Sequence, residues 1–593
     1  MPYNGWRTGW VTAAYVCVFT LITQTLFLPV EAGGATGSQP QEPASLLSLG
    51  EQQFVSERKE GIRNSLQSLG MHINADSVPH IALLGSGGGQ RAAVALLGSL
   101  QQMGQDDLLD TLLYMGGVSG SGWAMASLYT DPQWSTNTAA ALARLTQPGP
   151  EVDDIMAWLK VRSEQEDFSL SDLWGSLLSS SIMKQMDRTR LSDEAKRQTT
   201  NPYPVYSALE QKCYLDGQTK GKWFELTPHE SGFTELNHFT PTSLLGHRPS
   251  DSGASEGEKG VKGGKEEVME VEAEEEVMEV MGVEEVMEVM EVEVSGMDMV
   301  TLQGIIGSAM ADEQKMLAHL PDWLKNILDI HSSPSEGAVD SQERKTKVDA
   351  WMEKVLKPMR EGLLALPDGP VKDVVSWVVL KLLPLITEWK WGTTANFIYH
   401  SPDEFIPECL RSTENLQLVD AGLFLNSPYP PFLGPKRDVD LIISLDFSLG
   451  QSLKSLTLAR DYAVEVGKPF PVIDDTVLEE MDWPRDFYVF PGGRSAPTIV
   501  YMPLFNQRNC RDAAEVKSKM AEYTTVQMPY NQKKIAGMLK IAMDNMKNNK
   551  NKLMLEMHSA AVRKQERSVL RVLDWMPGLS SWITGQNPIT ILI

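Results

Sequence analysis

The stretch GGVSGSGW at residues 116–123 lies between the apolar run 112–115 and a run of small residues at 124–127. This order predicts a buried strand, a sharp turn and a helix. A serine in such a turn is held away from the sheet, with neighbours in tight backbone geometry that glycine tolerates best. We therefore predict that glycines close the turn around Ser119, beside a helix N-terminus that favours negative charge. From this stretch alone, a glycine- and serine-rich loop without chemistry is an equal alternative.

A second turn of this kind is predicted for GSGGG at 85–89, between the apolar run HIALL and the helical pattern RAAVALLGSLQQM. Such a turn can direct several backbone N–H groups at one point, which suits an oxyanion. Gly88 and Gly89 are therefore candidate donors to the tetrahedral intermediate of acyl transfer. A nucleotide site is disfavoured, because the third glycine of G-x-G-x-x-G would fall on Gln90 and no Lys-Ser/Thr follows.

Arg91 lies just inside the helix that follows this second turn. A guanidinium there can hold a phosphate through two parallel hydrogen bonds. A salt bridge to a nearby carboxylate is the alternative interpretation.

A serine nucleophile needs a base, and the stretch LQLVDAGLFLNSPYP at 416–430 offers one. A short apolar strand is predicted to end at Asp420, where apolar surroundings would raise the basicity of the carboxylate. A helix-cap or turn aspartate is the competing interpretation. His558 is the one histidine after this motif, so a Ser-Asp-His triad stays open, although His558 lies in a polar, Lys-rich segment.

The 593-residue chain exceeds the usual size of one hydrophobic core, so two domains or one large domain with insertions are expected. Its 42% hydrophobic and 22% charged residues are ordinary globular values. About half of the net charge of −25 comes from residues 256–293, which contain 15 Glu and 3 Lys. The mildly acidic remainder gives no argument for nucleic-acid binding.

Residues 248–296 contain a nine-residue repeat that begins at 268, 277 and 286. Nine residues turn a helix by about 900°, so apolar faces reverse at each repeat, and an odd period also swaps faces in a strand. Neither element can present a continuous apolar side. We predict a solvated or disordered insertion, with an acidic interaction segment as the alternative.

The remaining unusual stretches lie mostly toward the two ends of the chain. Residues 9–30 carry no charge and fit a signal peptide or anchor, or a leader without a targeting role. Residues 33–46 are typical of a flexible linker, and 47–70 of an amphipathic helix. The apolar, Trp-containing stretches 371–391 and 568–593 fit either a membrane interface or core helices.

The four cysteines, at positions 17, 213, 409 and 510, form no C-x-x-C pair. We expect neither a zinc site nor a disulfide framework, and hence a reducing compartment.

GSGGGQRA, GVSGSGW and VDAG occur in this order, together with WFELTPHESGF at 223–233, WKWGTTANFIYH at 389–400 and LIISLDFS at 441–448. In this combination the chain resembles the cytosolic phospholipase A2 family over about 47–247 and 297–565. It is most similar to the calcium-independent gamma branch, since the segment before the catalytic region leaves no room for the family's calcium-binding C2 domain.

The resemblance implies an α/β fold: a central, mostly parallel sheet flanked by helices, with a helical cap or lid loosely within 150–400. This is a patatin-like arrangement, related to the α/β-hydrolases. We expect an apolar N-terminal segment and linker at 1–46 and the first part of the catalytic domain at 47–247. The acidic insert follows at 248–296, and the second part of the catalytic domain at 297–593.

For the site, the resemblance implies that Ser119 is the nucleophile and Asp420 its dyad partner. It makes Gly88 and Gly89 the oxyanion donors and Arg91 the phosphate-binding residue. The implied reaction cleaves the sn-2 acyl ester of glycerophospholipids through an acyl-enzyme, with lysophospholipase and transacylase activity in the same site. No metal or cofactor is implied, and the expected partners are phospholipid substrates and a membrane surface, with a cytoplasmic, membrane-associated location.

Two features depart from the family pattern. The chain ends in Ile-Thr-Ile-Leu-Ile, without the C-a-a-X box often found in the gamma branch, so no prenyl anchor is implied. The acidic insert interrupts a region where the family continues with ordered chain. A catalytically inactive lipid-binding homologue is therefore the alternative to an active enzyme, beside a general serine esterase that uses His558.

Overall fold

The computed structural model of the protein describes residues 47–197, 199–247, 296–309, 390–450, 452–525 and 529–574, and also Trp377, Leu380, Lys381, Pro384 and Leu385. The predicted segment 1–46 and all of the predicted insert 248–296 except Gly296 lie outside the described residues, as do most of 371–391 and all side chains from 568 onward.

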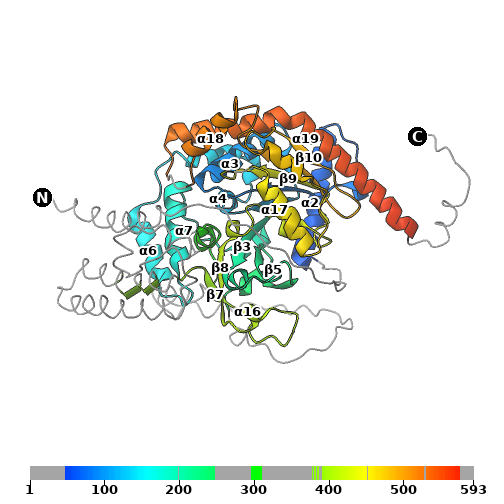
Figure 1. Ribbon diagram of the computed structural model, residues 1–593. Coiled ribbons are helices and arrows are strands. Elements are labelled where there is room, and N and C mark those ends of the chain that lie inside the picture. Colours follow the sequence, from blue (N-terminus) through cyan, green and yellow to red (C-terminus); the bar gives the residue numbers. More distant parts are fainter. Residues whose placement is uncertain are drawn as a thin grey trace, which may run out of the picture.

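An eleven-stranded sheet forms the centre of the described chain (Figure 1). Its main path runs β10-β11-β9-β1-β2-β3-β4-β5-β6, and β8 pairs with β3 and β7. The strands are β1 Ile81–Gly85, β2 Tyr114–Gly117, β3 Tyr203–Glu210, β4 Trp223–Leu226, β5 Glu230–Phe233, β6 His238–Pro241, β7 Thr393–Ala395, β8 Asn415–Asp420, β9 Leu441–Asp446, β10 Tyr488–Phe490 and β11 Thr498–Pro503.

The middle of the sheet is parallel, as predicted: β11, β9, β1, β2 and β3 run in one direction. The strands added at both ends, and β8, run antiparallel to their neighbours. β1, β9 and β11 are apolar for most of their length and buried at every position. Strands covered on both faces need this composition, because each face packs against helices.

Helices cover this parallel block, and both predicted strand–turn–helix units are confirmed. The described α-helices are α2 Leu49–Ser68, α3 Gln90–Gln105, α4 Gly120–Leu128, α5 Thr138–Arg144, α6 Val152–Arg162, α7 Leu170–Leu177, α8 Gln211–Leu215, α10 Met299–Ile306, α16 Glu408–Arg411, α17 Lys454–Glu465, α18 Ala513–Glu522 and α19 Gln532–Asp574. Helix α2 confirms the predicted helix at 47–70, and the Ser48 hydroxyl accepts the N–H of Glu51 at its start.

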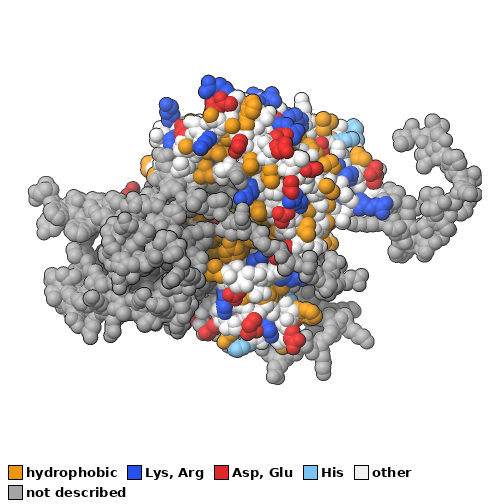
Figure 2. Space-filling view, viewed as in Figure 1, with side chains coloured by type: hydrophobic (Ala, Val, Ile, Leu, Met, Phe, Trp, Pro, Cys, Tyr) orange, Lys and Arg blue, Asp and Glu red, His pale blue; other side chains and the backbone are white. Residues whose placement is uncertain are grey.

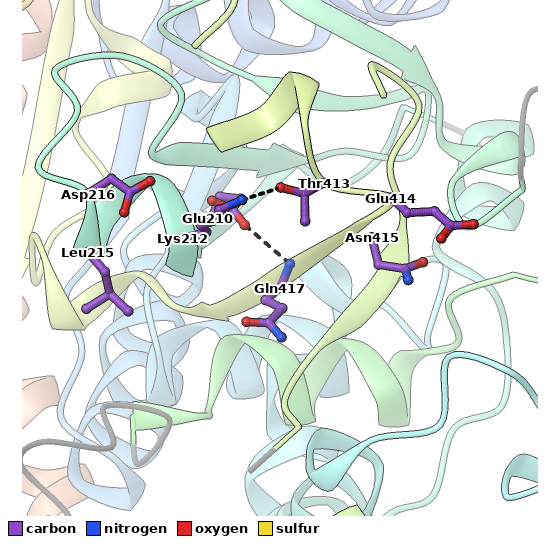
Figure 3. Close-up of a pocket in the computed structure, with 8 residues that line it drawn as sticks. All are labelled: Glu210, Lys212, Leu215, Asp216, Thr413, Glu414, Asn415 and Gln417. Carbon is purple, nitrogen blue, oxygen red and sulfur yellow. Dashed lines mark hydrogen bonds between the residues drawn. The ribbon is translucent and has the colours of Figure 1, made fainter. Parts of the chain in front are cut away.

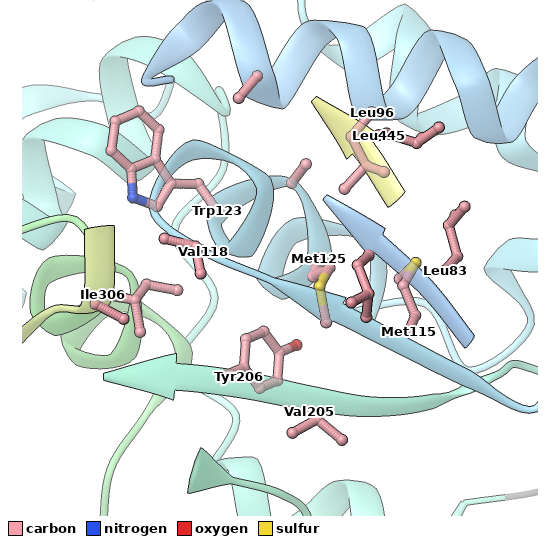
Figure 4. Close-up of a cluster of buried hydrophobic side chains, with 14 of the residues drawn as sticks. Leu83, Leu96, Met115, Val118, Trp123, Met125, Val205, Tyr206, Ile306 and Leu445 are labelled. Atoms are coloured by element: carbon pink, nitrogen blue, oxygen red, sulfur yellow. The ribbon is translucent and has the colours of Figure 1, made fainter. Parts of the chain in front are cut away.

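The hydrophobic core lies between the parallel strands and their helices (Figure 4). Leu83 of β1, Met115 of β2 and Tyr206 of β3 are fully buried beside Met125 of α4. Ile306 of α10 joins the same cluster. The chain that follows the acidic insert is therefore part of the core that supports the first strands.

Helix α19 runs along α3 at the upper side of the molecule (Figure 1). It buries one stripe of residues at helical spacing, Met538, Ala542, Met546, Leu553 and Met557. On the visible outer surface, basic and acidic side chains are interspersed over α18 and α19 (Figure 2). Within the described residues, no helix combines the length and apolarity that crossing a bilayer requires.

The expectation that the chain lacks a disulfide is wrong, because Cys213 and Cys409 are bonded, with Cα atoms 5.4 Å apart. They are 196 residues apart in the chain. They meet because α8 follows β3, α16 precedes β8, and these two strands pair. Such a pair leaves no local spacing signal, so the absence of C-x-x-C could not exclude it. The argument for a reducing compartment loses its basis.

Candidate active site

Ser119 lies between β2 and α4 with φ 52° and ψ −124°. A non-glycine residue in this region costs about 1–3 kcal/mol and persists only where the surroundings enforce it. The strain falls on the serine itself, and Gly120 is needed for a different reason. A Cβ at Gly120 would lie 2.0 Å from the carbonyl oxygen of Gly89. The glycines therefore allow two turns to touch, which differs from the prediction that they take up the strained backbone.

The second turn joins β1 to α3 and lies directly against the first. Gly89 has φ 60°, a left-handed conformation that favours glycine. No described group accepts a hydrogen bond from the N–H of Gly88 or Gly89. These two donors are the ones predicted for an oxyanion, and they stay available beside Ser119.

Asp420 reaches the same place from a distant part of the chain. Strand β2 ends at Gly117, which lies opposite Tyr206 of β3. Strand β8 arrives antiparallel and ends with Asp420 opposite Ala208. Because β4 occupies the other edge of β3 at Ala208, the ends of β2 and β8 converge along one edge. The register of β3 thus brings the serine turn and the aspartate together.

Asp420 is 1% exposed and Ser119 8% exposed. Burial raises the pKa of Asp420 to about 7, against the opposing effects of the Ser119 hydroxyl and of the Gly422 N–H. Oδ1 accepts the Gly422 N–H at 2.8 Å. No hydrogen bond of full geometry reaches Oδ2. The Ser119 hydroxyl nevertheless lowers the pKa of Asp420, so the two groups are neighbours, and catalytic hydrogen bonds commonly tighten only when substrate binds.

Two serines that the sequence argument did not single out tie the turns together. Ser121 Oγ donates to the carbonyl oxygen of Ser86 at 2.6 Å, from the serine turn to the glycine turn. Ser86 Oγ accepts the backbone N–H of Phe447 at 2.7 Å, and this bond joins the residue that follows β9 to the glycine turn. Ser86 and Ser121 both lie inside the glycine-rich motifs, and this position is the sequence signal that could have identified them as site residues.

Arg91 is fully buried at the start of α3. Its Nε donates to the carbonyl oxygen of Phe447 at 2.8 Å, and one terminal nitrogen donates to that of Tyr523 at 2.5 Å. The other terminal nitrogen has no partner among the described residues. Burial lowers the pKa of Arg91 to about 10, which leaves it charged at neutral pH. Phosphate binding stays a prediction; in this arrangement the guanidinium fastens loops beside Gly88.

His558 is exposed on α19. No described hydrogen bond or ion pair joins it to Ser119 or Asp420, so the described contacts do not assemble a Ser-Asp-His triad. Nor does any group of His, Cys, Asp and Glu side chains in the described part of the chain have the arrangement of a metal site.

A cavity of about 470 Å³ lies at the other end of β8 (Figure 3). Its lining includes Glu210, Lys212 and Gln417, and Glu210 Oε1 accepts the N–H of Gln417 at 3.4 Å. None of the predicted site residues lines it. Burial raises the pKa of Glu210 to about 7, as it does that of Asp420, so a raised pKa does not distinguish the two places. We assign the chemistry to the buried serine and aspartate, because the strained Ser119 and the two N–H groups without a described acceptor lie there and not at this cavity.

A mixed sheet with a parallel centre, and a strained serine at a strand-to-helix turn, is the arrangement of an α/β-hydrolase-type fold. Residues 81–263 match the family described as lysophospholipase catalytic domain. The chain is 28% identical over 551 residues to human cytosolic phospholipase A2 gamma, covering 86% of this chain and 94% of that protein. Its identity to human cytosolic phospholipase A2 zeta is 30% over 504 residues, 78% of this chain and 53% of zeta. Over most of its length the chain is therefore similar to members of the cytosolic phospholipase A2 family.

Solved structures support the fold. Human GIVD cytosolic phospholipase A2 matches with a TM-score of 0.61 at 22% identity, over 88% of this chain and 67% of that one. The same human protein in complex with methyl gamma-linolenyl fluorophosphonate matches with a TM-score of 0.54 at 22% identity, over 89% of this chain and 66% of that one.

Proposed function

We propose that this protein hydrolyses the sn-2 acyl ester of glycerophospholipids, and the acyl ester of lysophospholipids, through an acyl-enzyme on Ser119. The observation that carries the proposal is the pairing of a strained Ser119 with Asp420, a buried carboxylate whose pKa is raised to about 7. A general base works best when its pKa is near the working pH. The free N–H groups of Gly88 and Gly89 complete the set of groups that acyl transfer needs.

In the first half-reaction, Asp420 accepts the Ser119 proton while the serine oxygen bonds to the ester carbonyl carbon. The carbonyl oxygen becomes an oxyanion that Gly88 and Gly89 stabilise. When the ester C–O bond breaks, the leaving lysophospholipid oxygen takes the proton from Asp420. Water then gives a proton to Asp420, attacks the acyl-enzyme and releases the fatty acid, and Ser119 regains its proton.

The names of the relatives support phospholipids as the substrate class, and the lysophospholipase description of the matching family supports the second activity. An acyl-enzyme can also be attacked by a second lipid alcohol, so transacylation belongs to the same proposal. We further propose that turnover needs no calcium and takes place at a cytoplasmic membrane surface. Equal rates with calcium and with a chelator, on zwitterionic vesicles, test the first of these points.

A lipid-like fluorophosphonate, followed by peptide mass spectrometry, tests the nucleophile. We expect one phosphonyl adduct, on Ser119, and none in Ser119→Ala. Ser99→Ala is the matched control, because Ser99 is buried in α3 and bonds only to the carbonyl of Ala95 among described contacts. A folded wild-type protein without an adduct would instead support the lipid-binding alternative. Loss of activity in His558→Ala would favour the triad esterase.

A further inference from the structure

Asn426 lies six residues beyond Asp420 and bonds to the glycine turn between β1 and α3. Its backbone carbonyl accepts the N–H of Gly87 at 3.0 Å. Its side-chain Nδ2 donates to the carbonyl oxygen of Gly87 at 3.3 Å. Asn426 therefore bonds both polar groups of Gly87 from 339 positions away in the chain, and the neighbouring Ser86 Oγ also donates to the Gly87 carbonyl oxygen at 3.3 Å.

The second of these bonds has a consequence for Gly88. A peptide unit is planar and trans, so the C=O of Gly87 and the N–H of Gly88 belong to one rigid plane and point in opposite directions. When Asn426 fixes the Gly87 oxygen on one side, it fixes the direction of the Gly88 N–H on the other. That N–H is one of the two donors without an acceptor beside Ser119.

The Asn426 side chain is itself held in place. Nδ2 also donates to Ser448 Oγ at 2.6 Å, which uses its second hydrogen. Oδ1 lies so close to the turn that a Cβ at Gly87 would be 2.3 Å from it and 3.1 Å from Ser119 Cβ. Asn426 and Ser119 therefore face the same point of the turn, and Asn426 has no hydrogen left with which to bind substrate.

We propose that Asn426 is a positioning residue, which aims the Gly88 N–H at the oxyanion by holding the Gly87 carbonyl. This inference rests on the proposed function, because an oxyanion forms only if Ser119 attacks an ester. It differs from the proposed function in naming the residue that orients the donor.

The alternative is that Asn426 only stabilises the fold, and Asn396 provides the matched control. Asn396 Nδ2 also donates twice, at 2.7 Å to the carbonyl oxygens of Leu410 and Thr413. It is buried, and among the described residues it has no hydrogen bond with Ser119, Asp420 or the glycine turn. Asn396 Oδ1 also accepts the N–H of Ile398 at 3.0 Å, so Asn396→Ala removes three side-chain hydrogen bonds against the two of Asn426, without touching the proposed donor.

The experiment measures kcat and KM on zwitterionic lysophospholipid in neutral detergent micelles, and the phosphonylation rate of Ser119. For Asn426→Ala we expect kcat and the phosphonylation rate to fall together by roughly 10²-fold, the effect of losing one oxyanion donor. KM should change less than about twofold, because an oxyanion contact is made only in the transition state. Asn396→Ala should lower thermal stability but keep kcat.

A milder variant covers the case in which Asn426→Ala does not fold. Ser448→Ala leaves the bond to Gly87 and removes the other restraint on Nδ2, and kcat should fall several-fold at unchanged KM. The inference is overturned if Asn426→Ala keeps kcat within about twofold of the wild-type value. Where Asn426→Ala does not fold, the same result in Ser448→Ala overturns it. A loss of kcat in Asn396→Ala as large as that in Asn426→Ala also overturns it. A wild-type protein without turnover or Ser119 adduct refutes the proposed function itself.

Discussion

Two buried carboxylates flank β3, and they differ in nearly everything except their burial. Glu225 of β4 lies opposite Ser207, and Asp420 of β8 lies opposite the next residue, Ala208. Their exposed fractions are 0% and 1%. Burial alone would raise the pKa of both, because it disfavours the charged form.

Glu225 is surrounded by cations. Arg437 donates to one of its oxygens at 2.5 Å and Lys436 to the other at 3.0 Å. These two partners overcome the effect of burial and hold the pKa of Glu225 below its usual value. Arg437 also bonds both oxygens of Glu51, so the network fastens α2 to the sheet.

Burial raises the pKa of Asp420, and the groups that oppose this effect are the Ser119 hydroxyl and the Gly422 N–H, neither of which is a cation. Its pKa therefore stays raised, to about 7. The difference between the two sites separates two uses of a buried carboxylate. With cations it is a permanent charge that joins elements, and without them it is a group that exchanges protons near neutral pH.

The largest expected effect concerns activity. Asp420→Ala should lower kcat by roughly 10²–10⁴-fold, because a positioned general base contributes that much. Glu225→Gln should keep kcat within about threefold per folded molecule, since its charge acts on the fold. Turnover is measured on lysophospholipid micelles and normalised to the folded fraction from near-UV circular dichroism. Equal losses in the two variants would contradict the division of roles.

Stability should show the reverse order. Glu225→Gln leaves the buried Arg437 and the partly buried Lys436 with less compensation, and loss of one partner of a buried ion pair costs about 3–5 kcal/mol. Urea unfolding at pH 7 measures the change. Glu480→Gln is the control, because Glu480 pairs with Arg485 at a partly exposed site, where a salt bridge contributes about 0–1 kcal/mol. A similar small loss in both variants would refute the structural role of the Glu225 network.

Asp420→Asn should stabilise the protein while it removes activity. The folded state raises the pKa of Asp420 from 3.8 to about 7, so the ionised carboxylate destabilises the fold above pH 7. At 1.36 kcal/mol per pKa unit, the neutral variant gains up to about 4 kcal/mol at pH 8. The gain declines as pH falls through the window from about 7 to 3.8, because wild-type Asp420 becomes protonated. Thermal unfolding at pH 8 and pH 5 should show this trend, and a gain independent of pH would contradict it.

Much of this site could be predicted because its parts are local patterns. A strand, a glycine turn and a helix follow one another within 80–105 and within 112–129, and these turns, like the strand that ends at Asp420, are where the sequence analysis expected them. Backbone geometry at a turn depends on a few neighbouring residues, so a short stretch carries the information.

The remaining features depend on partners far away in the chain. The convergence of β2 and β8 on one edge of β3 is a property of register, which no single segment contains. The disulfide between Cys213 and Cys409 and the bond between Asn426 and Gly87 follow from that register. The strain on Ser119 could not be assigned either, because the close approach of Gly120 to Gly89 is a contact between two turns that neither stretch contains alone.

The smallest expected effect is on the shape of the profile of kcat/KM against pH. This profile shows whether Asp420 or Glu225 is the carboxylate whose protonation controls activity. Only the ionised form of Asp420 can accept the Ser119 proton, so kcat/KM should rise with pH and level off above about 7. Below that point it should fall about tenfold per pH unit, since one proton inactivates the site. Neutral detergent micelles with a zwitterionic lysophospholipid avoid a surface potential that would shift the local pH.

Glu225→Gln should leave the midpoint of this profile unchanged, although it lowers stability, because Glu225 lies on the other edge of β3. A midpoint near 4 in the wild-type protein would mean that Asp420 has an ordinary carboxylate pKa and that its burial has no catalytic consequence. A midpoint that moves in Glu225→Gln would mean that the two carboxylates titrate as a coupled pair. Either result would remove the distinction between a carboxylate that holds charge and one that exchanges it.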